Sequence, residues 1–172
     1  MATLTISVPK AAVVEAVKGD TYITSSVDRG ADSVKNAGVA YNEAAGDDTH
    51  HEKKIERLIK GAVSKFAADL SEFVDTASGT ISTTIPASTG NITITMTVTS
   101  RYQSGLANPL SGIAQDYIVN MALYGWWMSI KPELAKNFAA LATDALVYVR
   151  KCFAKTAPAS TADPTAASGS VA

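Results

Sequence analysis

Apolar and polar residues alternate in two parts of the chain, and this alternation predicts β-strands. In TLTISV, residues 3–8, aliphatic side chains occupy every second position, as a strand with one buried face requires. Residues 80–100 repeat the pattern in two runs around PASTGN, where Pro86 ends the first run and Gly90 and Asn91 favour a turn. The sequence therefore predicts a short N-terminal strand and a β-hairpin, whose aliphatic face contains Ile92, Ile94, Met96 and Val98.

The predicted hairpin needs cover on its aliphatic face and along its edges. An isolated hairpin is marginally stable in water, so we expect the aliphatic face to rest on a helix. The strands lack the charged residues that usually keep exposed edges from pairing with other chains. We expect residues 3–8 to pair with one edge and a neighbouring copy of the chain to pair with the other.

Four segments have apolar residues spaced by three or four positions, which predicts helices. In the second of them, Thr49 and Glu52 fit a capping box, which satisfies free backbone N–H groups at a helix start. Residues 20–48 break the pattern and predict a long loop, which in compact domains is usually functional or ordered by a partner. The predicted helices are residues 9–19, residues 49–74, a segment that begins at Asn108, and residues 132–155.

The helix that begins at Asn108 is apolar around more than half of its circumference. Such a helix is buried on several sides, which we do not expect a domain of three or four helices to achieve alone. Its first apolar stripe contains Leu110, Ile113, Ala114, Tyr117, Ile118, Met121, Tyr124 and Met128, and its second contains Val119, Leu123, Trp126 and Ile130. In the following helix, the residues expected to face the core are Leu134, Phe138, Leu141, Ala145, Tyr148, Val149 and Cys152.

Two adjacent tryptophans, Trp126 and Trp127, stand near the end of that third helix. Neighbouring residues of a helix point in different directions, so we expect at most one indole to lie fully in the core. The other is either half-exposed or an anchor of a subunit interface, where tryptophan is enriched. A base-stacking platform needs nearby basic residues, and Lys131 alone gives it little support.

The composition changes abruptly after Lys155. The segment TAPASTADPTAASGSVA contains small residues and two prolines, and none of its side chains is large enough to anchor a core. We therefore divide the chain into a helical domain with a β-hairpin, residues 1–155, and a tail, residues 156–172. The tail is either disordered or an extended segment docked on a partner. The expected fold is α+β and mainly α: a small helical bundle with a hairpin, a short N-terminal strand and this tail.

The overall composition excludes some classes of protein. Hydrophobic residues make up 47% of the 172 residues and charged residues 18%, which excludes a wholly disordered chain. The net charge of −1 argues against a protein that binds nucleic acid by neutralising phosphates. The single cysteine, Cys152, cannot form an internal disulfide, and we expect it to be a small buried group. We find no signal-peptide pattern and no apolar run long enough to cross a membrane, and expect a protein made in the cytoplasm.

The segment DDTHHE, residues 47–52, is the cluster richest in residue types that bind metals. Adjacent helical residues point about 100° apart, so His50 and His51 are not expected to share one ion, and the HExxH spacing is absent. Asp116 and Asp144 fit the polar faces of their helices rather than a buried acid–base site. No glycine-rich phosphate-binding motif occurs. We therefore expect no enzymatic activity, no metal and no cofactor.

The order of the predicted elements resembles that of the head-to-tail connector, or adaptor, proteins of tailed bacteriophages. It runs from an N-terminal strand and short helix through a long amphipathic helix, a β-hairpin, a helix with IVNMALYGWWMSI, a terminal helix and a tail. The resemblance covers most of the chain and implies a structural protein of the virion neck or tail. It implies a homo-oligomeric ring, dodecameric, whose partners are the portal protein and tail or other neck proteins. DNA would pass through such a ring without specific contacts, which suits a nearly neutral chain.

Two other functions compete with the connector. One is a small cytoplasmic helical protein-binding module, with a groove near Trp126 and Met128 that receives a partner peptide. The other is an enzyme that uses His50 or His51. For the connector, the residues expected at interfaces are Trp126, Trp127, Ile92, Ile94, Met96, Val98, Pro158 and Pro164.

Overall fold

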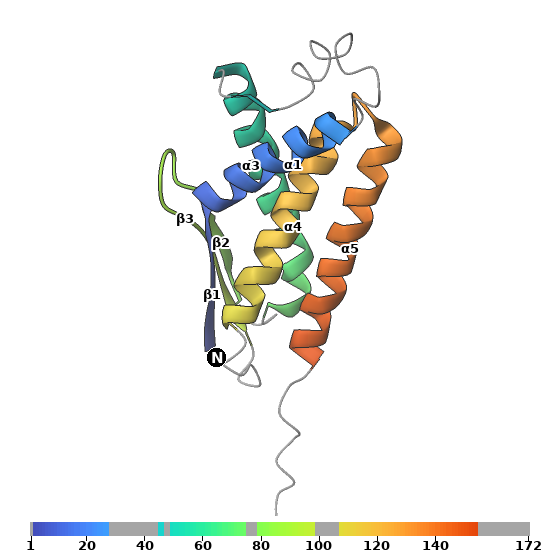
Figure 1. Ribbon diagram of the computed structural model, residues 1–172. Helices are drawn as coiled ribbons and strands as arrows, with labels where there is room; N and C mark the ends of the chain where they lie inside the picture. Colours follow the sequence, from blue (N-terminus) through green and yellow to red (C-terminus); the bar gives the residue numbers. More distant parts are fainter. Residues whose placement is uncertain (1, 28–44, 47–48, 75–78, 99–106, 155–172) are drawn as a thin grey trace, which may run out of the picture.

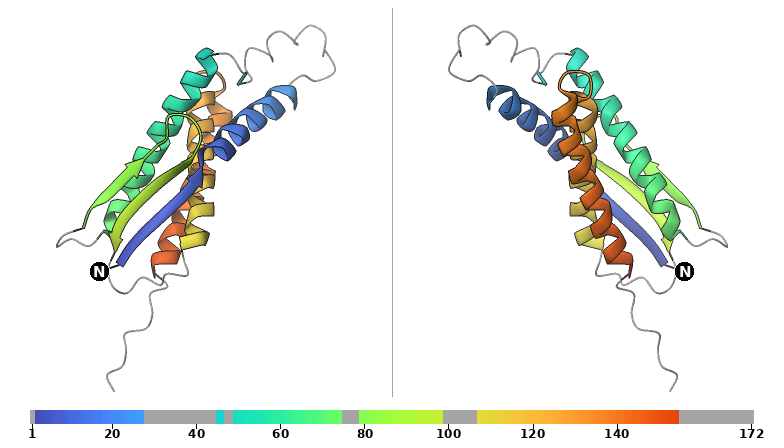
Figure 2. Two further views of the ribbon diagram at one scale, coloured as in Figure 1. Left: turned by 90° about the vertical axis from the view of Figure 1, so that its left-hand side faces the viewer. Right: turned by 90° about the vertical axis from the view of Figure 1, so that its right-hand side faces the viewer.

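A small antiparallel sheet packs against a layer of helices in the computed structural model, which describes residues 2–27, 45–46, 49–74, 79–98 and 107–154 (Figures 1 and 2). The fold is therefore α+β and mainly α, as the sequence predicts. Within the described residues, no helix has both the length and the apolarity needed to cross a membrane. The elements are β1 (Ala2–Pro9), α1 (Lys10–Val27), α3 (Thr49–Leu70), the short 3-10 helix η1 (Ser71–Phe73), β2 (Ile81–Thr84), β3 (Asn91–Val98), α4 (Ala107–Trp127) and α5 (Pro132–Ala154).

The sheet has the strand order β1–β3–β2. The prediction that the N-terminal strand pairs with one edge of the hairpin is confirmed, since Ile6 lies opposite Ile94 in an antiparallel register. On the other side of β3, Ile81 of β2 lies opposite Met96. The aliphatic face rests on the helices, as expected, and its buried side chains are Leu4, Ile6, Val8, Ile92, Ile94, Met96 and Val98.

The two outer strands, β1 and β2, form the edges of this sheet. At the end of β1, the backbone N–H groups of even-numbered residues point toward β3, as the hydrogen bond from the Lys10 N–H to the Gly90 carbonyl shows (3.1 Å). The Ser7 N–H therefore points away from β3, where it donates to Ser111 Oγ of α4 (3.2 Å). A helix thus satisfies one donor on the outer edge of β1. That a neighbouring copy pairs with the free edge of the hairpin stays a prediction.

Helix α4 runs through the centre of the domain, where it contacts α1, α3, α5 and β1 (Figure 1). Both of its apolar stripes are largely buried, and the expectation that the chain alone cannot cover such a helix is wrong. The reason is that the sheet supplies a surface that a count of helices leaves out. The buried residues of α4 are Leu110, Ala114, Tyr117, Ile118, Val119, Ala122, Leu123, Trp126 and Trp127.

Both tryptophans are in the core, which corrects the expectation that at most one is. Trp126 is 1% exposed and Trp127 is 0% exposed. Trp126 lies against α3, with its ring 5.3 Å from the His51 ring and 4.0 Å from Lys54 Nζ. The two indoles can point in different directions and still be buried, because α4 has neighbours on several sides. The Nε1 of Trp127 is buried without a hydrogen-bond partner in the part of the chain described.

Helix α1 continues to Val27, although we expected it to end at Gly19. Its second half is polar in sequence, but two hydroxyls fold back onto the helix. Thr21 Oγ1 donates to the Lys18 carbonyl and Ser25 Oγ donates to the Tyr22 carbonyl, each at 2.9 Å, and both side chains are buried. Local hydrogen bonds of this kind satisfy polar groups that otherwise resist burial. The rest of the predicted loop lies outside the described residues, apart from Ala45 and Gly46.

Helix α5 packs on α4 through small residues. Ala135, Ala142, Ala145 and Val149 are buried, whereas Leu141 and Tyr148 are 52% and 57% exposed. The expectation that Leu141 and Tyr148 face the core is therefore wrong, while Ala145 and Val149 are buried as predicted. Alanines let two helix backbones approach closely, and this turns the larger residues of α5 outward. Leu134, Phe138 and Cys152 are partly buried at the boundary.

The alanine contact between α4 and α5 predicts that Ala135→Leu destabilises the protein, since Ala135 is 0% exposed. An added side chain in a packed core costs about 2 kcal/mol, because neighbouring side chains must move. Urea denaturation followed by circular dichroism measures the loss. Ala140→Leu on the exposed side of α5 is the matched control and is expected to change the free energy of unfolding by less than about 0.5 kcal/mol. Equal effects of the two substitutions would contradict this orientation of α5.

Candidate functional site

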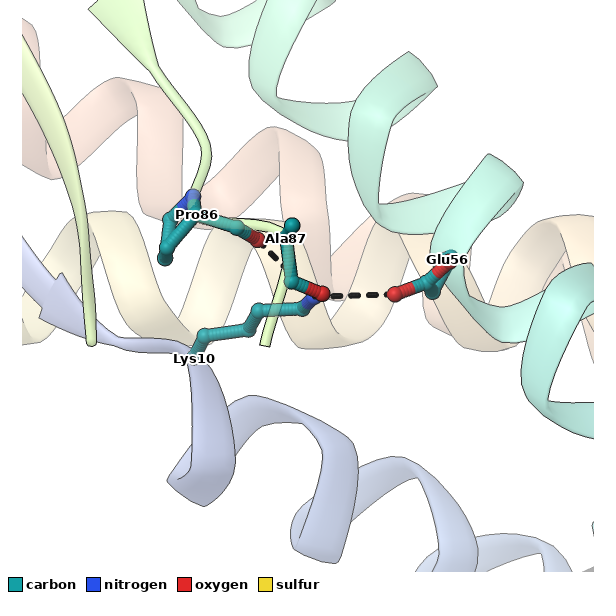
Figure 3. A network of polar contacts seen from close by, with 4 residues as sticks. All are labelled: Lys10, Glu56, Pro86 and Ala87. Carbon is teal, nitrogen blue, oxygen red and sulfur yellow. Dashed lines mark hydrogen bonds and ion pairs between the residues drawn. The ribbon is translucent and has the colours of Figure 1, made fainter. Parts of the chain in front are cut away.

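A buried lysine joins three elements at one end of the sheet. Lys10, at the junction of β1 and α1, is 6% exposed. Its Nζ donates to Glu56 Oε1 of α3 (2.9 Å) and to the carbonyls of Pro86 and Ala87 (both 3.0 Å; Figure 3). The three donors of the ammonium group thus have three acceptors, as a buried charge requires.

The local sequence around the hairpin turn explains why these carbonyls are available. Pro86 lies beyond the end of β2, so its carbonyl points out of the strand ladder. Gly90 has φ of +133°, a conformation that favours glycine, and so brings the chain back into β3. Lys10 holds this turn twice, through its side chain and through its backbone N–H, which donates to the Gly90 carbonyl.

The Lys10 ammonium group also changes the acidity of its partner. The hydrogen bond from Lys10 lowers the pKa of the Glu56 carboxyl below its ordinary value, and the positive charge of Lys10 adds to this effect. The carboxylate side chain keeps contact with solvent, whereas the lysine does not. The main effect of the Lys10–Glu56 pair is therefore to hold the hairpin turn in place against α3, and not to create a reactive group.

Beside this junction lies a groove of about 780 Å³ between α1, α3 and the hairpin turn, which we call the α1–α3 groove. Its lining combines apolar and charged side chains, and exposed charged residues such as Lys53 lie on its rim. On the rim, Lys18 Nζ lies 4.0 Å from Glu52 Oε1. Lys53 is exposed, and no ion pair of Lys53 occurs within the described ranges. Apolar lining comes from Ala11, Val14, Ile55 and Ala87, and charged lining from Lys10, Glu15, Lys18, Glu52, Lys53 and Glu56.

A second candidate surface lies on α5. Leu134, Leu141 and Tyr148 recur every seven residues, so they share one face of the helix, which we call the outer seam. Lys151 Nζ lies 4.9 Å from the centre of the Tyr148 ring. Asp144 lies between Leu141 and Tyr148 in the sequence and is exposed, with no ion pair among the residues described. The α5 helix lies on the right in Figure 1, whereas the hairpin lies on the left.

Six of the predicted interface residues lie in the core of the chain itself. Trp126, Trp127, Ile92, Ile94, Met96 and Val98 are all at most 2% exposed. A partner cannot reach these side chains while the domain is folded, so the prediction that they form an interface surface is wrong. The other two, Pro158 and Pro164, lie outside the described residues. Trp126 also cannot line the peptide groove that we considered near Met128.

The two histidines do not face each other. His51 Nδ1 accepts a hydrogen bond from the Gly46 N–H (2.9 Å), while His50 is exposed. No group of three or more His, Cys, Asp or Glu side chains suited to a metal ion occurs in the part of the chain that the structure describes. Asp116 and Asp144 are exposed, in agreement with their predicted places on polar helix faces.

One further polar contact lies between α3 and α4. The Tyr117 hydroxyl donates to Asp69 Oδ2 (3.1 Å) at the edge of the buried region. Burial raises the pKa of the Tyr117 phenol, and the negative charge of Asp69 raises it further. A phenol that holds its proton this firmly links two helices and is poorly suited to act as a base.

Sequence reasoning missed both candidate surfaces. The side chain of Lys10 binds Glu56, which is 46 positions away in the chain, and Pro86, which is 76 positions away. No local pattern in the sequence indicates such contacts. For α5, the repeated alanines at Ala135 and Ala142 were a usable signal, because they mark a close helix contact on a different face from the larger residues.

The chain matches no protein-family model, and the comparisons with curated proteins and with solved structures also find no match.

The lysine junction predicts that Lys10→Met lowers the free energy of unfolding by about 3 kcal/mol, since two carbonyls and a carboxylate lose their donor. Chemical denaturation measures this loss. Lys53→Met is the matched control on the neighbouring rim, and we expect it to have an effect below about 0.5 kcal/mol. An equally small effect of Lys10→Met would show that the junction contributes little to stability.

The same junction predicts a dependence on pH. The folded protein holds the Glu56 carboxyl at a lower pKa than the unfolded chain does, so the pair stabilises the fold above the unfolded pKa. This stabilisation is lost as the pH falls through the pKa of the folded state. Between about pH 6 and pH 3, we expect the free energy of unfolding of the Glu56→Gln variant to fall less than that of the original chain. If the two free energies of unfolding fall in parallel with pH, the pair makes no such contribution.

Proposed function

We propose that the chain is a structural virion protein, a head-to-tail connector that forms a homo-oligomeric ring between the portal and the tail. The observation that carries the proposal is the outer seam of α5, with Leu141 and Tyr148 more than half exposed. Apolar side chains aligned along one helix face favour contact with another protein surface. In a ring, each copy supplies that surface to its neighbour.

The order of elements supports a connector rather than another kind of oligomer. The structure contains a strand and helix, a long helix, a hairpin, an aromatic-bearing helix and a terminal helix, in the order on which the resemblance to connector proteins rests. The net charge of −1 also suits a ring through which DNA passes without being held. A structural role of this kind requires no catalytic group.

A protein-binding module is the second candidate, and the α1–α3 groove favours it. The volume of about 780 Å³ and the apolar part of the lining suit a bound peptide or side chain from a partner. A module of this kind functions as a monomer or dimer, whereas a connector must assemble into larger particles. The size of the particles in solution therefore separates the two candidates.

The proposal predicts that the purified protein assembles or binds the portal protein encoded in the same genome. Sedimentation velocity over a range of concentrations measures assembly, and co-purification of the two proteins measures portal binding. We expect particles much larger than one 17.9 kDa chain, alone or on the portal. A protein that stays monomeric at high concentration and also fails to bind the portal would contradict the proposal.

A further inference from the structure

Two side chains of the outer seam, Leu141 and Tyr148, are more than half exposed, while Leu134 is partly buried. Beside them on the helix lie a carboxylate, Asp144, the aliphatic Val147, which is also exposed, and Lys151, whose Nζ is 4.9 Å from the centre of the Tyr148 ring. A surface that covers the seam must be apolar and concave, because Leu141 and Tyr148 project from a convex helix. It must also present a positive charge where Asp144 comes to lie, since a buried carboxylate without a partner is costly.

The α1–α3 groove of the same chain has these properties. It is concave and holds about 780 Å³, within the usual range of binding sites in proteins. Its apolar lining comes from the side chains of Ala11, Val14, Ile55 and Ala87. Lys53 stands on its rim, exposed and with no ion pair among the described residues.

The charges restrict how the seam can enter the groove. The lining also carries three carboxylates, Glu15, Glu52 and Glu56, which would repel Asp144. The charge of Glu52 is partly offset by Lys18, and that of Glu56 by Lys10. The favourable orientation therefore places Asp144 at the Lys53 side of the groove and away from Glu15.

The two surfaces cannot meet within one chain. The outer seam lies on α5, and the groove lies between α1, α3 and the hairpin turn, on the side of the domain away from α5 (Figures 1 and 2). Contact between two different surfaces of identical chains is heterologous, and it repeats from copy to copy. Such contacts close into a ring when the rotation per copy allows it.

We propose that the outer seam of one copy docks in the α1–α3 groove of the next copy, with Asp144 paired to Lys53 of that neighbour. This inference rests on the proposed oligomeric function and assigns the surfaces that join adjacent copies. Leu141 and Tyr148 supply the apolar contact, and the ion pair sets the orientation. The contact is directional, so each copy has one seam engaged and one groove filled.

Charge reversal tests the pairing. In Asp144→Lys, a lysine meets Lys53, and in Lys53→Asp, an aspartate meets Asp144. Like charges facing each other weaken an interface, so each variant alone is expected to assemble at least about tenfold more weakly than the original chain. Both residues are exposed and have no ion pair within the described chain, so the fold of each variant should persist, and circular dichroism verifies this.

Mixing the two variants gives the decisive result. In an equimolar mixture, the seam of the Asp144→Lys variant meets the groove of the Lys53→Asp variant with opposite charges, and the reverse contact is also attractive. The mixture is therefore expected to assemble within about threefold of the original chain, in alternating order, as measured by sedimentation velocity. Asp116→Lys and Lys65→Asp, at exposed positions outside both surfaces, serve as charge controls and should leave assembly unchanged.

The possible outcomes separate this inference from the proposed function. If the original chain assembles but neither variant is weakened, or the mixture is no stronger than the single variants, the seam-to-groove contact is overturned and the connector remains. If the original chain neither assembles nor binds the portal, both fail. If folding of a variant is impaired, Leu141→Ser with Ala140→Ser as control decides the matter. Loss of assembly in Leu141→Ser alone supports the seam, and unchanged assembly overturns it.

Discussion

The burial of α4 determines how the other helices and the sheet are arranged. This helix is apolar around most of its circumference, and α1, α3, α5 and β1 each cover part of it. The sheet, with β1 nearest to the helix, and α3 cover it on one side, while α5 packs along it on another. The two indoles are the largest side chains buried in this way. A polar residue at either position would place an unsatisfied group in the core.

The way in which α5 covers α4 determines what remains on the surface. Small residues at Ala135, Ala142 and Ala145 allow a close approach of the two helices. That approach turns Leu141 and Tyr148 away from the core, so α5 carries part of the apolar surface that is left for other molecules. At the other side of the domain, Lys10 holds the hairpin turn against α3 and so shapes the groove between α1 and α3.

Local patterns were enough to predict most of the elements. The alternation around PASTGN predicted the hairpin, and the spacing of apolar residues predicted α3 and α5 almost to their ends. The patterns did not reveal how many neighbours a helix has, so the burial of both Trp126 and Trp127 was missed. Helix α5 has two neighbouring apolar faces, one with Ala135 and Ala142 and the other with Leu141 and Tyr148, and the sequence alone could not show which of them turns inward. The extension of α1 beyond Gly19 depends on hydroxyl groups that bond to their own helix. The Lys10 junction joins segments far apart in the chain and has no local signal.

We propose that copies of this chain complete one another through α5 and the α1–α3 groove, and a cryo-EM reconstruction of the assembled protein would show whether they do. We expect a closed ring in which Leu141 and Tyr148 of each copy lie in the groove of the next. A ring in which the outer face of α5 is open to solvent, or particles that contain one copy each, would contradict this proposal.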